Sequence, residues 1–226
     1  MRAKGTAAPD DLGLEPTAPA NAKQAHADLI RSDILEVATR EFAALGYAGA
    51  RIDEIAAQTR TSKRMIYYHF GGKEGLYRAA LLDCYSRIRA IESTLDLGAR
   101  PPLEALAHLV RFTFDYQLNN ADFIRLVMVE NIHRAEHMSA IPELHGLNLG
   151  VIATLGEIVD RGVAQGLMRR DIDLIDLHMS ISALCFFNVS NRYTFSILHE
   201  VDMAATRTTA RRRETVVELI LRSVAP

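Results

Sequence analysis

Residues 61–73 read TSKRMIYYHFGGK, and the interpretation of the whole chain depends on this stretch. Ser62 is a favourable N-cap residue, so we predict a short helix that begins there and runs to about His69. Two cations follow the cap directly, and the sequence YYHF comes about one turn later. By itself such a helix is more often a solvated face than a binding site, so the neighbouring segments must decide between the two.

The segment before this helix favours a binding role. Residues 52–58, IDEIAAQ, have the amphipathic pattern of a two-turn helix, and the sequence TRT separates the two helices. Two short helices joined by a tight turn suit a helix-turn-helix, in which the first helix braces the second and the second enters the major groove of DNA. The apolar residues expected to hold the two helices at a fixed angle are Ile52, Ile55, Ile66 and Phe70.

The charge distribution indicates a local nucleic-acid site. The chain has 226 residues, of which 49% are hydrophobic, a formal net charge of -2 and a pI of about 6.4. Between Ile55 and Lys73, however, there are four lysines or arginines and His69, and no acidic residue. We therefore expect a basic patch on a protein that is not basic overall.

The rest of the sequence is predicted to be helical. Apolar residues recur at helical spacing, no segment alternates like a β-strand, and no repeat of fixed period occurs. We expect an all-α protein in which a long fourth helix, starting near Lys73, joins a three-helix N-terminal domain to a helical bundle. The segment 1–24 contains three prolines and no apolar period, so we expect a disordered arm.

Residues 42–81, FAALGYAGARIDEIAAQTRTSKRMIYYHFGGKEGLYRAAL, resemble the N-terminal domain of TetR/AcrR-type bacterial transcriptional regulators. The signature Y-x-H-F-x-x-K-x-x-L occurs here as Tyr67, His69, Phe70, Lys73 and Leu76. The resemblance implies a DNA-binding domain at 25–75 and an effector-binding and dimerisation domain at 76–226. It also implies a homodimeric repressor that a small organic effector releases from a palindromic operator in double-stranded DNA.

The predicted recognition helix separates base contacts from phosphate contacts. Lys63 and Arg64 lie in its first turn, where either can donate to guanine O6 and N7. Tyr67 and Tyr68 can contact phosphates and thymine methyls, and Lys73 can bind phosphate at the start of the next helix. The full set of expected DNA contacts is Arg51, Arg60, Thr61, Ser62, Lys63, Arg64, Met65, Tyr67, Tyr68, His69 and Lys73.

Two positions depart from the pattern of the family. Arg60 stands where a turn glycine is usual, so it must adopt a positive φ or the turn must change. Arg51 stands where a serine or threonine usually opens the first of the two helices, and it cannot cap that helix with a hydroxyl. Either arginine is an alternative phosphate contact.

The C-terminal segments 174–199 and 206–224 are apolar on more than one face. Such faces suit a homodimer interface in which two helices of each copy pair, and the alternative is that both helices are buried within one domain. Asn188 and Arg192 are candidates for effector binding, although either can instead bond across the dimer or face water. The full set of expected effector contacts is Tyr85, Ile88, Phe112, Tyr116, Phe123, Met128, Asn131, Asn188 and Arg192.

Other classes of site are less well supported. His133 and His137 are four residues apart with Glu130 one turn before them, so a metal-responsive regulator is an alternative, but no HExxH motif occurs. An effector-independent DNA-binding regulator is a second alternative, and a small helical enzyme is a remote one, because no GxSxG, P-loop or dinucleotide motif occurs. We expect no catalytic residues, metal or cofactor.

Cysteine usage and hydropathy bear on the compartment. Cys84 and Cys185 are far apart and form no CxxC pair, which argues against a disulfide framework or a thiolate zinc site. No apolar run is long enough to span a membrane, and no signal peptide is visible. We therefore expect a cytoplasmic protein, associated with the nucleoid when it is bound to DNA.

Overall fold

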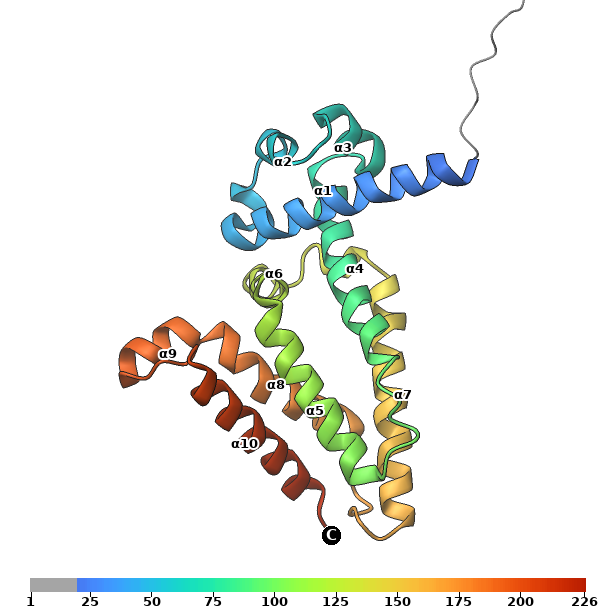
Figure 1. The fold of residues 1–226 in the computed structure, drawn as a ribbon, viewed down its shortest axis with the longest axis vertical. Helices are drawn as coiled ribbons and strands as arrows, with labels where there is room; N and C mark the ends of the chain where they lie inside the picture. The colour runs from blue at the N-terminus through green and yellow to red at the C-terminus, as the bar shows by residue number, and fades with distance from the viewer. Residues whose placement is uncertain (1–19) are drawn as a thin grey trace, which may run out of the picture.

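The computed structural model describes residues 20–226, and this part of the chain is helical and contains no β-strand, as expected (Figure 1). The α-helices are α1 (Ala20–Gly49), α2 (Ile52–Gln58), α3 (Lys63–Phe70), α4 (Lys73–Glu92), α5 (Pro102–Asn119), α6 (Ala121–Ile132), α7 (Glu143–Ala164), α8 (Leu174–Ser190), α9 (Arg192–His199) and α10 (Thr206–Val224), and a 3-10 turn, η1, spans Met138–Ala140. Residues 20–24, expected to end the disordered arm, instead open α1, and the rest of that arm lies outside the described residues.

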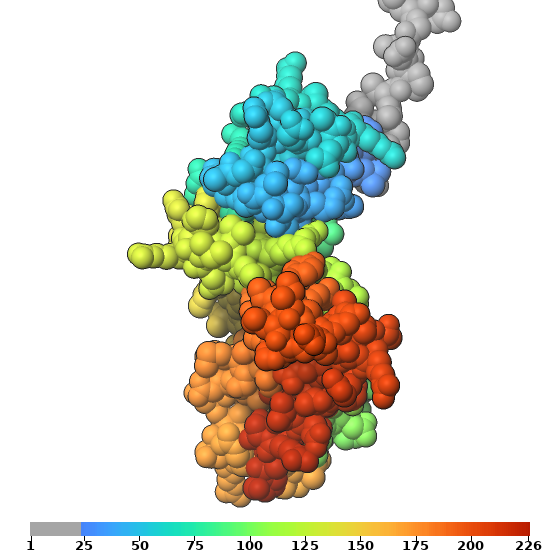
Figure 2. Space-filling model, turned by 90° about the vertical axis from the view of Figure 1, so that its left-hand side faces the viewer, coloured from blue at the N-terminus to red at the C-terminus, as the bar shows by residue number. Residues whose placement is uncertain are grey.

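The helices form two parts joined by α4. Helices α1, α2 and α3 make a small unit at one end, and α4 runs from it into a bundle made by α5, α7, α8 and α10 (Figure 1). At about 1.5 Å per residue, the 20 residues of α4 form a rod of roughly 30 Å. Helix α6 lies directly beneath α1, and Figure 2 shows this segment in yellow-green between the two parts.

The N-terminal unit does not have a core of its own. Phe42 from α1 and Tyr77 from α4 are both fully buried, and their rings meet edge to face with centroids 4.8 Å apart. The same hydrophobic cluster includes Ile55 and Ile66, as the sequence predicts, and also takes in side chains beyond α4. The more distant members of this cluster are Leu126 from α6, Ile141 just after η1 and Leu144 in the first turn of α7.

A second hydrophobic cluster fills the bundle. Buried residues of α5, α7, α8 and α10 meet there, among them Leu106, Leu155, Ile181 and Ile220. These four helices are therefore held by packing that is separate from the packing beneath the helix-turn-helix. None of the helices between residues 20 and 226 combines the length and the apolar character that a membrane crossing requires.

The predicted long helix at 174–199 is wrong, because the chain breaks at Asn191 into α8 and α9. The Asn188 amide near the end of α8 donates to the backbone carbonyls of Leu184 and Cys185, at 2.6 and 3.2 Å. Such side-chain bonds to the backbone compete with helix continuation, and a polar run of residues 190–192 follows. After the break, α9 projects from the bundle (Figure 1).

The two cysteines occupy different cores. Cys84 is buried in the first cluster and Cys185 in the second, and neither forms a disulfide. Burial raises the pKa of the Cys84 thiol to about 11 and that of the Cys185 thiol to about 12. Both side chains are therefore protonated packing residues at neutral pH.

Gly75 is required where α3 meets α4. A Cβ atom at this position would lie 1.9 Å from the carbonyl oxygen of Phe70. We expect Gly75→Ala to lower the free energy of unfolding by about 1–3 kcal/mol or more, because the two helices must move apart. Gly146→Ala is the matched control, since a Cβ atom there meets nothing within 4 Å, and it should raise stability by about 0.5–1 kcal/mol. Urea denaturation of both variants measures the difference, and equal stability of the two would contradict the proposed close contact.

Candidate nucleic-acid interface and ligand cavity

Helices α2 and α3 form the predicted helix-turn-helix, with a turn that uses no left-handed residue. Thr59 is extended at φ -95° and ψ 163°, and its backbone N–H is bonded to Ile55 and Ala56. Arg60 does not adopt a positive φ. Its backbone N–H instead donates to Oδ2 of Asp33 on α1, at 3.1 Å. The missing turn glycine is thus accommodated by a changed turn anchored on α1.

The N-cap residues of α2 and α3 make no side-chain capping hydrogen bonds. Ser62 occupies the N-cap position of α3 with an extended backbone, as predicted, although its side chain makes no capping hydrogen bond. Arg51 occupies the N-cap position of α2 and also makes no side-chain cap. Both side chains are exposed, which leaves the Ser62 hydroxyl and the Arg51 guanidinium available to a ligand.

The exposed surface of α3 carries the predicted cations and tyrosines. Lys63, Arg64, Tyr67 and Tyr68 are exposed, and 78% of the Tyr68 surface is accessible. Within residues 20–226, Arg64 makes no ion pair and no side-chain hydrogen bond, so its guanidinium is unengaged. Thr61, Met65 and His69 are half-buried. The structure therefore brings most of the expected DNA contacts onto one short helix.

Lys63 is already paired with an acid. Its Nζ lies 2.7 Å from Oδ1 of Asp53 on α2, and this hydrogen bond raises the pKa of Lys63 above its ordinary value. The charge of nearby Arg51 acts in the opposite direction. Since the pair is solvent-exposed, it contributes little to stability and can open to a stronger acceptor.

Lys73 opens α4, but its side chain turns back toward α1. Its Nζ donates to the carbonyl oxygen of Ala48 at 3.2 Å and lies 4.9 Å from the ring centroid of Tyr47. Gly71 caps α3 in the left-handed conformation at φ 74°, which its lack of a side chain permits. Lys73 is thus part of the junction between α1 and α4, at the edge of the α3 surface.

A cavity of about 390 Å³ lies between α4, α5, α6, α7 and α8. Most of its wall is aliphatic or aromatic, as is usual for sites that bind small organic molecules. The polar side chains in the wall are Tyr85, Arg89, Glu92, Thr113, Gln117, Asn148, His178 and Ser182.

The acidic and basic side chains in the cavity wall add little net charge to it, because two of them pair with each other and burial disfavours the charge of the third. Arg89 forms an ion pair with Glu92 on the next turn of α4, and both side chains are mostly buried. Burial raises the pKa of Glu92, against the opposing effect of Arg89, and burial also lowers the pKa of His178. Burial thus favours the neutral form of the His178 imidazole.

Two polar atoms of the cavity residues have no partner among the described residues. They are Nε of Arg89, a charged donor, and Oε1 of Gln117, an acceptor, and both are buried. Buried polar atoms are normally hydrogen-bonded, so an unpaired donor and an unpaired acceptor in one cavity wall suggest a ligand that supplies both complements.

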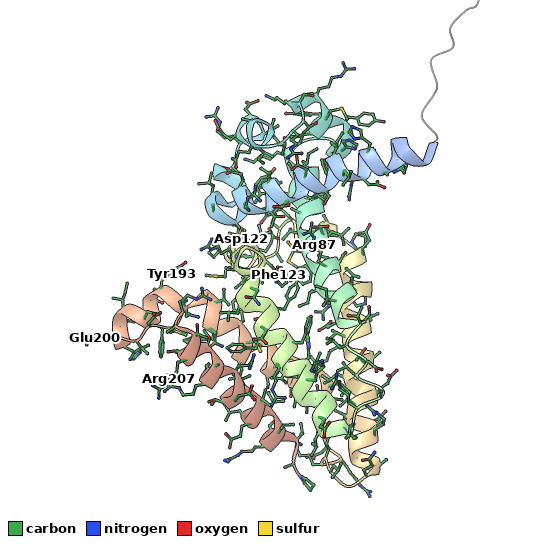
Figure 3. All side chains as sticks on the ribbon, in the orientation of Figure 1. Arg87, Asp122, Phe123, Tyr193, Glu200 and Arg207 are labelled. Carbon is green, nitrogen blue, oxygen red and sulfur yellow. The ribbon has the colours of Figure 1, made fainter. Side chains whose placement is uncertain are left out.

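The predicted effector contacts are distributed over several places. Tyr85, Ile88 and Phe123 line the cavity, whereas Tyr116 lines a second hollow of about 360 Å³ between α1, α4 and the start of α6, near Arg87, Asp122 and Phe123 (Figure 3). Phe112 packs on Tyr116, with ring centroids 5.7 Å apart. Asn188 lines a hollow of about 430 Å³ between α8, α9 and α10, and Met128 and Arg192 line a smaller hollow of about 120 Å³. Asn131 is exposed and lines none of these hollows.

The sequence reasoning missed the polar residues on the inner faces of α4, α5 and α8. Arg89, Gln117 and His178 were not among the expected contacts, although each interrupts an apolar helix face. Thr113 and Gln117, four residues apart on α5, are both buried, and such a polar pair within an apolar stripe is a usable signal.

The geometry required by the metal interpretation is absent. Helix α6 ends at Ile132, so His133 and His137 do not share a helix face. His133 is exposed, whereas His137 is buried with its Nδ1 3.2 Å from Glu130. Among residues 20–226, no cluster of three histidine, cysteine or acidic side chains is placed to hold a metal ion.

Family models match both parts of the chain. Residues 34–80 match the model described as bacterial regulatory proteins, tetR family, and residues 102–220 match the tetracyclin repressor-like C-terminal domain. The HTH-type transcriptional repressor NicS of Pseudomonas putida is 34% identical over 198 residues, which cover 88% of this chain and 93% of NicS. The repressor AcnR of Corynebacterium glutamicum is 27% identical over 153 residues, 66% of this chain and 73% of AcnR.

Solved structures share the fold. The putative transcriptional regulator SCO4942 of Streptomyces coelicolor aligns with a TM-score of 0.64 at 24% identity, over 87% of this chain and 99% of that one. The ketosteroid transcriptional regulator KstR2 of Mycobacterium tuberculosis aligns with a TM-score of 0.59 at 19% identity, over 87% and 95%. The resemblance seen in residues 42–81 is confirmed, and relatives of this kind are regulators rather than enzymes. The chain belongs to the TetR family of bacterial regulatory proteins and is a DNA-binding transcriptional repressor.

Proposed function

We propose that the chain binds an inverted-repeat operator as a homodimer and that a small organic molecule in the 390 Å³ cavity releases it. The observation that carries the proposal is the arrangement of two sites along α4. At the N-terminal end of α4 lies α3, on which the unengaged Arg64 stands among exposed tyrosines, and the C-terminal half of α4 forms part of the cavity wall. TetR-family regulators typically bind operators and effectors as dimers. This chain has one surface suited to operator DNA, one suited to an effector and one suited to a second copy of itself.

Helix α3 is the proposed reader of the major groove. Arg64 is free to make a bidentate contact with guanine, whereas Lys63 must first leave Asp53 or share its charge with it. Tyr67 and Tyr68 present hydroxyl groups suited to phosphates on either side of the groove. Arg51 and Ser62, both exposed at helix starts, extend the same surface.

Arg64→Ala should cost about 1–3 kcal/mol on the operator and relax the preference at one base pair per half-site. Tyr67→Phe removes only a hydroxyl group and should weaken binding to all sequences alike. The operator is first selected from randomised DNA with the unaltered protein, and affinities are then measured by gel shift. Arg207→Ala is the control, because Arg207 is an exposed arginine on α10, far from α3 (Figure 3). Sequence-independent binding by the unaltered protein would refute the proposed readout.

The proposed dimer interface lies on α8 and α10. Met179, Ala183 and Phe187 repeat every four residues on α8, and all three are exposed. Leu219 on α10, which packs beside α8, is 45% exposed. Burial within one chain therefore leaves an apolar strip uncovered, which supports pairing with a second copy.

Ala183→Arg should convert the dimer to a monomer, because it places a charge in the middle of this strip without removing a core side chain. Leu184 is a poorer position for the added charge, since its side chain packs against the second hydrophobic cluster and its replacement would also disturb folding. Light scattering measures the molar mass of the variant in solution, and its affinity for the operator should fall when the dimer dissociates. Leu149→Arg, at a 57% exposed site on α7, should remain dimeric. A dimeric Ala183→Arg protein would exclude this interface.

The cavity is the proposed effector site, and α4 is the proposed connection to DNA. Arg89 and Glu92 lie at the C-terminal end of the helix that begins with Lys73. A ligand that shifts this rod alters the separation of the two α3 helices in a dimer. The wall suits a molecule with an aromatic or aliphatic body, an acceptor for Arg89 and a donor for Gln117.

A ligand found by thermal-shift screening of aromatic and heterocyclic acids should bind free protein roughly 5- to 150-fold more tightly than operator-bound protein. Titration with and without saturating operator measures this ratio. Gln117→Leu should weaken ligand binding by about 1–3 kcal/mol. It should not lower the stability of the free protein, because it removes an acceptor that has no partner there. Gln165→Leu, at an exposed site, is the control. Equal ligand affinities in the two titrations would mean that this ligand does not release the protein from DNA.

A further inference from the structure

Glu130 is a carboxylate buried at the C-terminal end of α6, with 1% of its surface exposed. Its Oε2 accepts hydrogen bonds from the backbone N–H groups of His137 and Met138, at 3.2 and 3.0 Å. Its Oε1 lies 3.2 Å from Nδ1 of His137. One buried side chain therefore fixes the loop 133–137 that follows α6, and acids so buried normally have a specific partner of this kind.

The His137 ring connects this loop to the DNA-binding unit. Its centroid lies 4.3 Å from that of Tyr47, in the last turn of α1, and 4.8 Å from that of Tyr77, near the start of α4. Tyr47 in turn lies beneath Nζ of Lys73, at 4.9 Å. A continuous set of contacts thus runs from the end of α6 to the residue that opens α4.

The loop held by Glu130 has a conformation that its own sequence does not favour. Arg134 and Ala135 both have φ of 58°, in the left-handed region that non-glycine residues rarely adopt. Consecutive residues in this region persist only where the surroundings impose the conformation. The bonds from Glu130 and the packing of His137 supply that constraint.

Helix α6 contacts both functional sites. Phe123, Ile124 and Val127 line the effector cavity, while Leu126 packs in the cluster beneath the helix-turn-helix. Glu130 follows one turn after Val127, so a displacement at the cavity wall acts directly on the loop and on His137.

The side chain of Tyr77 on α4 also lies close to Glu130. Its hydroxyl is buried and has no hydrogen-bond partner among the described residues. Burial, and after it the charge of Glu130, raise the pKa of Tyr77 above its ordinary range. A protonated hydroxyl therefore lies close to Glu130, beside the bonds that the carboxylate accepts from the loop.

We propose that Glu130 and His137 form an interdomain latch, a positioning pair that fixes the helix-turn-helix unit on α6 and so sets the separation of the two α3 helices on DNA. The latch rests on the proposed dimeric binding of an inverted repeat. It acts through placement, and neither residue contacts a base or the effector. A mutation of the pair should therefore change which operator spacing is preferred, which loss of stability alone would not do.

The test compares two pairs of matched variants. Glu130→Gln removes the charge with little change of shape, and His137→Phe keeps the ring that packs on Tyr47 while removing Nδ1. Glu136→Gln and His133→Phe are the controls, because both side chains are exposed in the same loop. Affinities are measured for a single half-site and for a series of inverted repeats that differ in spacing, around the operator selected with the unaltered protein.

The latch variants should lose roughly 5- to 150-fold in affinity for the selected operator and should shift the preferred spacing by about one base pair or more. Their affinity for a single half-site and the behaviour of both control variants should stay unchanged. The double variant Glu130→Gln/His137→Phe should behave like His137→Phe alone, because the two residues act as one unit. It also leaves no buried charge without a partner, so it provides a folded protein if Glu130→Gln is unstable by circular dichroism.

Folded latch variants that keep the original affinity and spacing would overturn the latch, even if the unaltered protein binds its operator as proposed. If the unaltered protein itself selects no inverted repeat, the proposed operator recognition fails first, and the latch fails with it. The two failures are therefore distinguishable in one set of measurements.

Discussion

Tyr77 is a fully buried side chain of α4 that contacts Phe42 from α1 on one side and His137 from the loop after α6 on the other. This contact joins three segments that are far apart in the sequence, and the cluster around it includes Leu126 and Leu144. The helix-turn-helix unit is consequently stabilised by burial against α6 and α7. It cannot rotate on the bundle without disturbing the hydrophobic cluster that it shares with α6 and α7.

This shared core changes how the molecule divides into functional parts. By sequence, α6 belongs to the C-terminal domain, and the matching C-terminal family model includes it. By packing, it belongs equally to the DNA-binding unit, because Leu126 lies in the first cluster while Phe123 and Val127 line the cavity. Side chains in well-packed cores move between discrete arrangements more readily than they deform. Two neighbouring helices, α4 and α6, therefore connect the cavity to the helix-turn-helix unit.

The sequence predicted the helix-turn-helix well because its signals are local. The helix at 52–58 has the predicted bounds, and the exposed side of α3 carries the predicted cations and tyrosines. Features that depend on tertiary contacts could not be predicted in this way. The Arg60 turn is anchored by Asp33 on another helix, and the break at Asn191 depends on side-chain bonds made by Asn188. The wall of the cavity was only partly predicted, because the sequence does not tell which polar residue on an apolar helix faces inward. Gln117 is buried there, whereas Asn131 is exposed.

The burial of both cysteines has a practical consequence for observing motion in this protein. Thiolate is the reactive form of cysteine, and the pKa values of about 11 and 12 for Cys84 and Cys185 leave very little of it at neutral pH. A maleimide or methanethiosulfonate reagent would therefore label a newly introduced surface cysteine selectively, with both native thiols left in place. Tyr68, at 78% exposure on α3, offers such a position. In a homodimer, one spin label at that position on each copy would make the distance between the two recognition helices directly measurable by pulsed electron resonance, without DNA in the sample.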